Sequence, residues 1–201
     1  MSKRVLLVRG GSLGRNTGLG AAHHNLVDLL ESRKVDGWQL AGICEYPLEK
    51  TSNPISRIWQ RWFAHPKRVA KEINRLVSNN QCDLVHITDQ EQGHLMPRNC
   101  PVPGIITVHF LFHLFPEHLR FSDEVIAVGD TQPGIVRRRD LQKLKAGINR
   151  ANHLLCNSKH TLEAAEQHFP TVAASRVPLG IESAKYHPEN NQTIKLDLPD
   201  K

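Results

Sequence analysis

Histidines and an aspartate cluster where two apolar runs of the chain end. His86 and Asp89 lie within and just after residues 83–88, and His109 ends residues 104–109. Imidazole and carboxylate groups at such places can hydrogen-bond sugar hydroxyls or carry protons. A buried, fully hydrogen-bonded histidine is the ordinary explanation for any one of them. Their shared placement favours a polar ligand site, which would also include the neighbouring His94 and His113.

A metal site is not expected at these histidines. His109 and His113 have the spacing of ligands on one helix, but the sequence predicts the end of a strand there. The four cysteines also lie far apart with no Cys-x-x-Cys pair, so neither a zinc site nor a disulfide framework is predicted.

A glycine-rich segment, residues 10–20, follows the first apolar run. Backbone N–H groups in such a loop can approach a phosphate, and a following helix adds roughly half a positive charge at its start. Gly18-x-Gly20 lacks the third glycine of the dinucleotide fingerprint, because His23 stands there, and the chain has no P-loop motif. A tight strand-to-helix turn is the simpler alternative to phosphate binding.

A basic, tryptophan-containing segment covers residues 53–77. Glu72 is its single acid, and it carries Trp59, Trp62 and Phe63. Near an anionic membrane each cation would contribute about 1 kcal/mol, with the aromatic rings at the interface. The alternative is a solvated helix whose rings face the core. Nucleic-acid binding is not expected, since aromatic residues are only 5% of the chain and no binding motif is present.

Apolar runs of strand length alternate with helical segments, which predicts crossover units and a parallel sheet with helices on both faces. The fold class is therefore Rossmann-like α/β. Ligands of such sheets lie outside the carboxyl ends of the strands, so residues 10–20, 88–94, 109–113 and 157–158 should converge on one crevice. Predicted strands are residues 4–9, 38–43, 83–88, 104–109, 153–157 and 176–179, and predicted helices are 21–33, 53–79, 134–152 and 159–168.

Length and composition indicate an ordinary globular protein. The 201 residues carry a net charge of +6, and the mean hydropathy is −0.40. The longest apolar run, residues 102–115, is shorter than the roughly 20 residues of a membrane-spanning helix. The N-terminus has no signal-peptide core. We expect a cytoplasmic protein, either free or peripheral at the inner face of the membrane.

Four segments together resemble the N-terminal domain of family 4 glycosyltransferases, which are retaining enzymes of the GT-B fold. The first is the strand, glycine loop and helix that contain Gly18-Leu-Gly20. The second is Cys82-Asp-Leu-Val-His86-Ile-Thr-Asp89, and the third is Gly104-Ile-Ile-Thr-Val-His109. The fourth is residues 150–161, with residues 176–182 after them. The sequence departs from the family where Leu19 separates the two glycines and where Phe110 replaces an aspartate.

The resemblance implies the acceptor-side half of a retaining, hexosyl-transferring glycosyltransferase with a nucleotide-sugar donor. That donor would be a co-substrate, so no cofactor is expected, and the acceptor would be a sugar or a lipid-linked molecule. His109 would be the catalytic-site residue beside the transferred sugar. Gly18 and Gly20 would face the donor diphosphate, and the acceptor side would be lined by His86, Asp89, His94 and Ser158.

The family's enzymes have a second domain that binds the donor. We therefore predict a Rossmann-like domain over residues 1–181 and an interdomain linker over residues 182–201, with the C-terminal donor-binding domain absent. Such a chain should be inactive alone and should need a C-terminal half or self-association.

Two other functions stay open. The first is a non-catalytic module that docks on an anionic membrane or a protein partner through the basic helix 54–77. The second is a nucleotide-cofactor oxidoreductase, because Glu45 falls about where a ribose-binding acid would sit, although the glycine pattern is not that of such enzymes.

Overall fold

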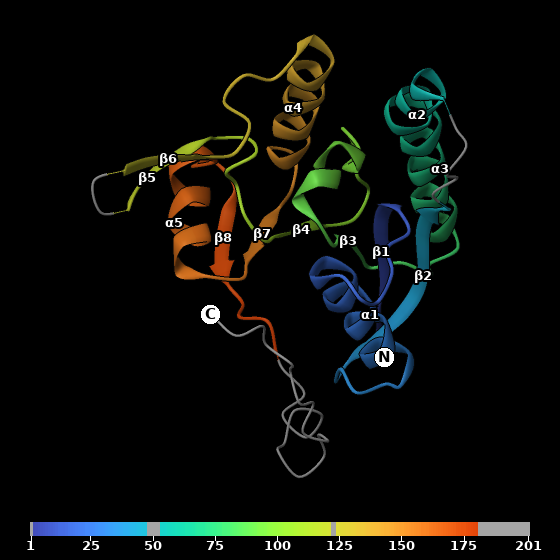
Figure 1. Ribbon diagram of the computed structural model, residues 1–201. Coiled ribbons are helices and arrows are strands. Elements are labelled where there is room, and N and C mark those ends of the chain that lie inside the picture. The colour runs from blue at the N-terminus through green and yellow to red at the C-terminus, as the bar shows by residue number, and fades with distance from the viewer. Residues whose placement is uncertain (1, 48–52, 122–123, 181–201) are drawn as a thin grey trace, which may run out of the picture.

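The computed structural model describes residues 2–47, 53–121 and 124–180. Its centre is a six-stranded sheet with the order β2-β1-β3-β4-β7-β8, in which every neighbouring pair is parallel (Figure 1). The order reverses between β1 and β3, which makes this the topological switch point. The strands are β1 (Lys3–Gly11), β2 (Trp38–Tyr46), β3 (Leu84–Ile87), β4 (Gly104–Val108), β7 (His153–Cys156) and β8 (Ala173–Arg176).

Helices cover both faces of the sheet. In Figure 1, α1 lies on one side of the sheet, while α3 and α4 lie on the other. This arrangement confirms the predicted Rossmann-like α/β class. The helices are α1 (Gly18–Glu31), α2 (Pro54–Trp59), α3 (His65–Ser78), α4 (Ile135–Ile148) and α5 (Lys159–His168), with a π-helical turn η1 (Gln60–Ala64) and a 3₁₀ helix η2 (Gln90–Leu95).

The alternation of side chains along β1 divides the core into two clusters. Leu6 and Val8 point into the larger cluster, which is shared with α3, α4 and α5, while Val5 and Leu7 point to the α1 side. All four side chains are almost completely buried. A strand that is buried on both faces has a continuous run of apolar residues, and this pattern is why the sequence predicted β1 correctly.

The segment 54–78 is one continuous helical run with a π-turn before Pro66. Proline has no N–H, and its ring disfavours a regular turn. In η1 the N–H of His65 bonds to the carbonyl of Gln60, so the carbonyl of Arg61 is released from its usual helical partner. His94 Nε2 donates to that carbonyl at 3.1 Å. The predicted break near Pro66 is therefore a widened helical turn, and the buried His94 supplies the hydrogen bond that the Arg61 carbonyl would otherwise lack.

Two features differ from the sequence prediction. The antiparallel hairpin of β5 (Glu117–Phe121) and β6 (Glu124–Val128) was not predicted, because its residues from Glu124 onward are mostly exposed and show no apolar alternation. The last strand is β8, not residues 176–179, since Pro178 cannot donate to a ladder. The predicted linker, residues 182–201, lies outside the described residues.

Helix α4 packs against η2 through two glycines. A Cβ on Gly147 would meet the backbone of Gly93 and His94, so only glycine permits this approach. The contact holds η2 beside the carboxyl end of β3. Among the described residues, no helix has the length and apolar character needed to cross a bilayer.

Candidate functional site

The carboxyl ends of β1, β3, β4 and β7 meet at one edge of the sheet and are joined by hydrogen bonds. Thr88, just after β3, contacts His23 of α1 through its hydroxyl at 3.0 Å and accepts from His109 through its carbonyl at 3.2 Å. The N–H of His109 donates to Gln90 Oε1 at 2.8 Å. Segments far apart in the sequence thus come together at the switch point, where α/β proteins bind ligands.

His109 is held in one orientation. Its Nε2 donates to the Thr88 carbonyl, which leaves Nδ1 as an acceptor. The side chain is half-buried. The aromatic rings of Phe110, Phe112 and His113 follow directly and contact one another with centroids 4.5 to 4.8 Å apart. An imidazole acceptor can bind a hydroxyl group of a ligand, and neighbouring aromatic rings can contact an apolar ring of the same ligand.

The two glycines at the start of α1 have different roles. Thr17 caps the helix, and its Oγ1 accepts from the N–H of Gly20 at 3.0 Å. Gly20 is buried, and a Cβ there would meet the carbonyl of Gly14. Gly18 is exposed with open space around it. In the described residues the N–H groups of Gly18 and Leu19 have no acceptor, so only Gly18 of the two predicted glycines is placed to meet a phosphate.

Replacing these glycines separates packing from ligand contact. Gly20→Ala should lower the free energy of unfolding by about 1–3 kcal/mol, because its methyl group would press on the Gly14 carbonyl and Thr17 Oγ1. Gly18→Ala, two residues away, should leave that energy unchanged or raise it by up to about 1 kcal/mol. Urea denaturation followed by circular dichroism measures both. Equal effects of the two variants would contradict this assignment.

His86 lies within β3 and is directed to the α1 side of the sheet. Its Nε2 is 2.7 Å from the hydroxyl of Thr107 on β4. Burial, with smaller contributions from His23 and His109, lowers the pKa of His86 to about 4. Burial followed by the charge of Arg9 also lowers the pKa of His23 to about 4. Both imidazoles are therefore neutral at pH 7, where they can hydrogen-bond but carry no charge.

Asp89 is the N-cap of η2 and belongs to a buried ion pair. Its carboxylate accepts from the N–H of Glu91 at 2.9 Å and lies 3.8 Å from Arg9 Nη2. Burial raises the pKa of Asp89 and lowers that of Arg9. Arg9 Nη1 and Gln90 Nε2 are buried donors without a partner among the described residues. These donors leave hydrogen-bonding capacity at the switch point.

Ser158 is the N-cap of α5. Its hydroxyl accepts from the N–H of Thr161 at 3.1 Å and lies 2.8 Å from Thr161 Oγ1. The Thr161 hydroxyl in turn lies 3.3 Å from the carbonyl of His109. Ser158 therefore lies close to His109 through one intervening residue, and its hydroxyl already has a structural role.

His94 is separated from the other predicted site residues. It lies on η2 and bonds to Arg61 on the face covered by α3 and α4. Burial, followed by the charge of Arg61, lowers its pKa to about 3. The structure thus brings Gly18, Asp89, His109 and Ser158 to one edge of the sheet. His86 lies within β3 next to this edge, and His94 is packed on the sheet face that α3 and α4 cover. The functional roles of all these residues remain predictions.

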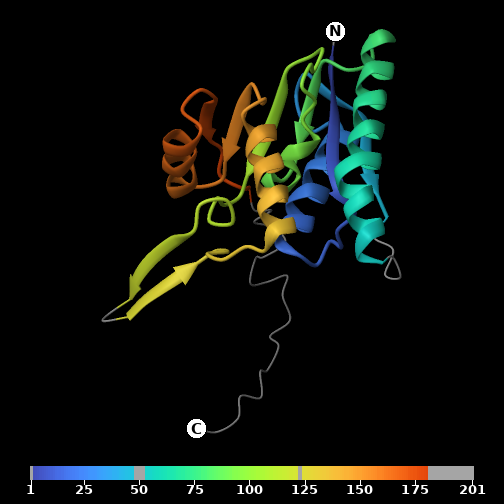
Figure 2. The same cartoon turned by 90° about the horizontal axis from the view of Figure 1, so that it is seen from above.

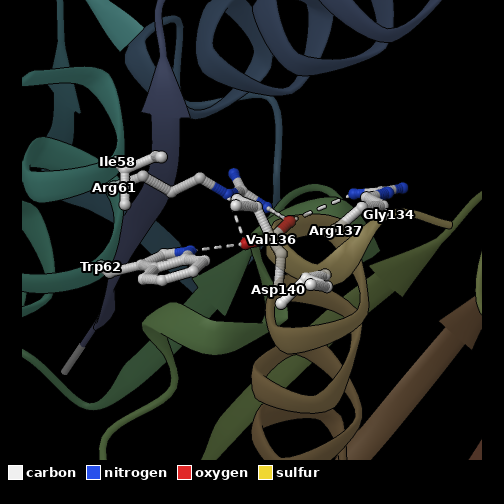
Figure 3. Close-up of a pocket in the computed structure, with 8 residues that line it drawn as sticks. Ile58, Arg61, Trp62, Gly134, Val136, Arg137 and Asp140 are labelled. Atoms are coloured by element: carbon white, nitrogen blue, oxygen red, sulfur yellow. Dashed lines mark hydrogen bonds and ion pairs between the residues drawn. The ribbon is translucent and has the colours of Figure 1, made fainter. Parts of the chain in front are cut away.

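A groove of about 530 Å³ opens between α2 with η1 and the start of α4 (Figure 3). Asp140 lies at its base and joins the two sides. Its carboxylate accepts from Arg61 Nε at 2.8 Å, from Trp62 Nε1 at 2.9 Å and from Arg137 Nη1 at 3.1 Å. Burial alone would raise the pKa of Asp140, but the bonds and charge of Arg61, together with the Trp62 bond and the charge of His94, outweigh it and hold the pKa below its usual value. Ile58, Ile135 and Val136 supply apolar walls.

Within residues 2–47, 53–121 and 124–180, no three side chains of His, Cys, Asp or Glu are placed to bind one ion. The polar edge offers hydrogen bonds and a helix N-terminus.

Solved structures share this fold. A UDP-glucosyltransferase from Polygonum tinctorium, capable of glucosylating indoxyl and bound to 3,4-dichloroaniline, matches 98% of the chain at 12% identity and a TM-score of 0.52. UGT2 of Phytolacca americana, with UDP-2fluoro-glucose and pterostilbene, matches 90% at 12% identity and a TM-score of 0.55. The match covers 56% and 53% of those chains, so this chain spans about half their length.

The fold is one half of the GT-B architecture. At such low identity the likeness establishes the fold alone. No protein-family model matches the chain. No curated protein matches it either. Assignment to family 4 accordingly rests on the sequence resemblance.

Sequence reasoning missed Arg9 and His23 and included Thr88 and Gln90 only as members of the segment 88–94. All four make or offer hydrogen bonds of this edge, yet none of them was given a role of its own. Arg9 and Thr88 directly follow apolar runs, which is the same signal that identified His109. His23 gave no such signal, because it lies inside a helix and meets the edge only through tertiary packing.

Proposed function

We propose that the chain is the acceptor-side half of a retaining GT-B glycosyltransferase of the family 4 type. The observation that carries the proposal is the edge that joins the start of α1 to His109. His23 of α1 and His109 both contact Thr88, so the N–H groups of Gly18 and Leu19 belong to the same edge as the imidazole. A helix N-terminus suits a diphosphate, and an imidazole acceptor suits a sugar hydroxyl.

The proposed reaction moves a hexosyl group from a nucleoside diphosphate sugar to an acceptor hydroxyl. The bond between the anomeric carbon and the diphosphate oxygen breaks, and the nucleoside diphosphate leaves with its electron pair. A new bond forms between the acceptor oxygen and the anomeric carbon, and the hydroxyl proton is released. Gly18 and Leu19 N–H groups would stabilise charge on the leaving diphosphate, while His109 Nδ1 would accept a hydrogen bond from the transferred sugar.

Asp89, Ser158 and His86 would support the acceptor side. Asp89 and Ser158 cap η2 and α5, and these caps fix the two segments that flank His109. His86 would be an uncharged side chain next to this edge, and its bond to Thr107 would join β3 to β4. The related structures carry UDP-2fluoro-glucose, pterostilbene or 3,4-dichloroaniline, which supports a UDP-sugar as the first donor to test.

The proposed enzyme needs a second half. We assign residues 1–181 to the acceptor-side domain and residues 182–201 to a linker. Sugar transfer would then require a donor-binding half, supplied in a longer polypeptide, by a separate chain or through self-association, while the chain alone would keep its own contacts with the donor diphosphate. We place the protein in the cytoplasm.

Titration of the ¹⁵N-labelled chain with UDP-glucose tests the donor contact. Amide shifts are expected for residues 10–20 and His109. Gly18→Asp should weaken this binding at least tenfold, because a carboxylate would stand at the start of α1 in open space. Gly18→Asn has the same shape without the charge and should bind within about threefold of the natural chain. Shifts confined to other parts of the molecule would overturn the proposal.

The stereochemistry of transfer tests the retaining assignment. With a donor-binding half supplied, the product anomer measured by NMR should match that of the donor sugar. An inverted product would remove the family 4 assignment and leave the sugar-transfer proposal standing. Absence of transfer in that complete protein would count against both.

A further inference from the structure

A stripe of exposed apolar side chains runs along α2 and η1. Ile55, Trp59 and Phe63 are 78%, 59% and 49% exposed. Their spacing of four residues places them on one side of the helix. Neither α2 nor η1 contains a buried residue, and these three side chains are largely open to solvent, with Lys143 Nζ 5.7 Å from the centre of the Phe63 ring.

The start of α4 adds two exposed apolar residues beside this stripe. Ile135 is 85% exposed and Val136 is 52% exposed. Figure 2 shows the start of α2 and the start of α4 at the same end of the molecule. The groove described above lies between them, and Ile58, Trp62, Ile135 and Val136 line it. Figure 3 shows Ile58 and Trp62 on one side of the groove and Val136 on the other. We call this surface, formed by residues 55–63 and 135–139, the α2–α4 end.

Positive charge surrounds the α2–α4 end. Residues 55–63 and 135–139 contain five arginines and no acid. Arg61 is paired with Asp140, and Arg137 with Asp140, Glu91 and Asp130. Arg138 and Arg139 are exposed next to Ile135, and Lys143 lies 5.4 Å from the centre of the Trp62 ring. The apolar residues therefore lie within a field that attracts anions.

We propose that the α2–α4 end docks on the surface of a lipid bilayer that carries anionic headgroups. Trp59, Ile135 and their neighbours enter the interface, and the surrounding cations meet the headgroups. A bilayer fits better than a protein partner, because the exposed Arg138 and Arg139 can meet the diffuse negative charge of headgroups without carboxylates placed to match them. The docking needs neither a nucleotide sugar nor a donor-binding half, so it stands apart from the proposed sugar transfer.

Vesicle sedimentation tests the electrostatic part. The chain should bind vesicles of phosphatidylcholine with phosphatidylglycerol more tightly than phosphatidylcholine alone, and salt should weaken the binding. Arg138→Gln/Arg139→Gln should lower the partition coefficient about 30-fold. The matched control Lys3→Gln/Lys34→Gln removes the same charge away from this end and should change it by less than about twofold.

A second pair of variants tests the apolar part. Trp59→Ser/Ile135→Ser should lower vesicle binding at least about tenfold, while the urea midpoint stays the same because both side chains are exposed. Leu29→Ser replaces an exposed apolar residue on α1, across the sheet, and should bind like the natural chain.

Three outcomes would overturn the proposal. They are absence of vesicle binding, equal binding to neutral vesicles in high salt, and equal loss in the matched controls. Concentration-dependent dimerisation that Trp59→Ser/Ile135→Ser abolishes, without vesicle binding, would instead identify an interface between copies of the chain. None of these outcomes bears on UDP-glucose titration.

Discussion

Lowering the pH from 7 to 5 is expected to remove about 6 kcal/mol from the free energy of unfolding. The pKa values of His23 and His86 are about 4 and that of His94 is about 3, each lowered chiefly by burial. The unfolded chain takes up protons near pH 6.5, while the folded chain does not. Each histidine therefore favours the unfolded state by about 2 kcal/mol more at pH 5 than at pH 7.

The direction of this effect follows from the sign of the shifts. The three histidines contribute full stability above about pH 6.5, and the contribution is lost as the pH falls toward 4. Asp89 acts in the opposite direction, because burial raises its pKa and protonation favours the folded state. Domains of this size are stable by about 5–15 kcal/mol, so this loss would remove between about 40% and all of the free energy of unfolding.

Urea denaturation at pH 7 and pH 5 measures the loss. His86→Gln keeps a group that can bond to Thr107 but cannot take up a proton, so it should lose about 4 kcal/mol over this range. His160→Gln is the matched control, because that side chain is 70% exposed, and it should behave like the natural chain. The same loss in His86→Gln as in the natural chain would show that His86 is not held neutral.

The parts of the fold that the sequence predicted are those whose pattern is local. β1 is a continuous apolar run, and α5 begins at the Ser158 cap and covers the same residues that were predicted, 159–168. The β5–β6 hairpin and β8 were not predicted correctly, because their pairing partners, not their own side chains, make them strands. The released carbonyl of Arg61 depends on the geometry around Pro66, which no local pattern shows.

The candidate site shows the same division. The sequence placed His109, Asp89 and Ser158 at strand ends, and the structure has them at one edge. Their packing roles were not predicted: Asp89 and Ser158 are helix caps. His94 follows a strand end in the sequence, but η2 turns it toward Arg61 and away from the edge. A strand-end pattern in the sequence shows that a residue lies near the edge of the sheet. It does not show which way the following turn directs the side chain.

Removing the carboxylate of Asp140 should have the next largest effect. Asp140→Ala leaves the partly buried guanidinium of Arg61 and the indole N–H of Trp62 without their shared acceptor. Loss of one partner of a buried ion pair costs about 3–5 kcal/mol, measured as the change in unfolding free energy. Asp36→Ala, which removes an exposed carboxylate, should change this energy by less than about 0.5 kcal/mol.

The distribution of the damage distinguishes this ion pair from general core packing. α2 and η1 bury no side chain fully, and the bonds of Arg61 and Trp62 to Asp140 join η1 to α4, together with the contacts of Lys143 with the Trp62 and Phe63 rings. Hydrogen exchange in Asp140→Ala should therefore quicken first at residues 54–62, while β1 and β4 keep their protection. Arg61→Met/Asp140→Leu removes both charges together and should recover most of the lost stability. Uniform loss of protection across the sheet would mean that Asp140 stabilises the whole domain and does not specifically hold the α2–α4 end in place.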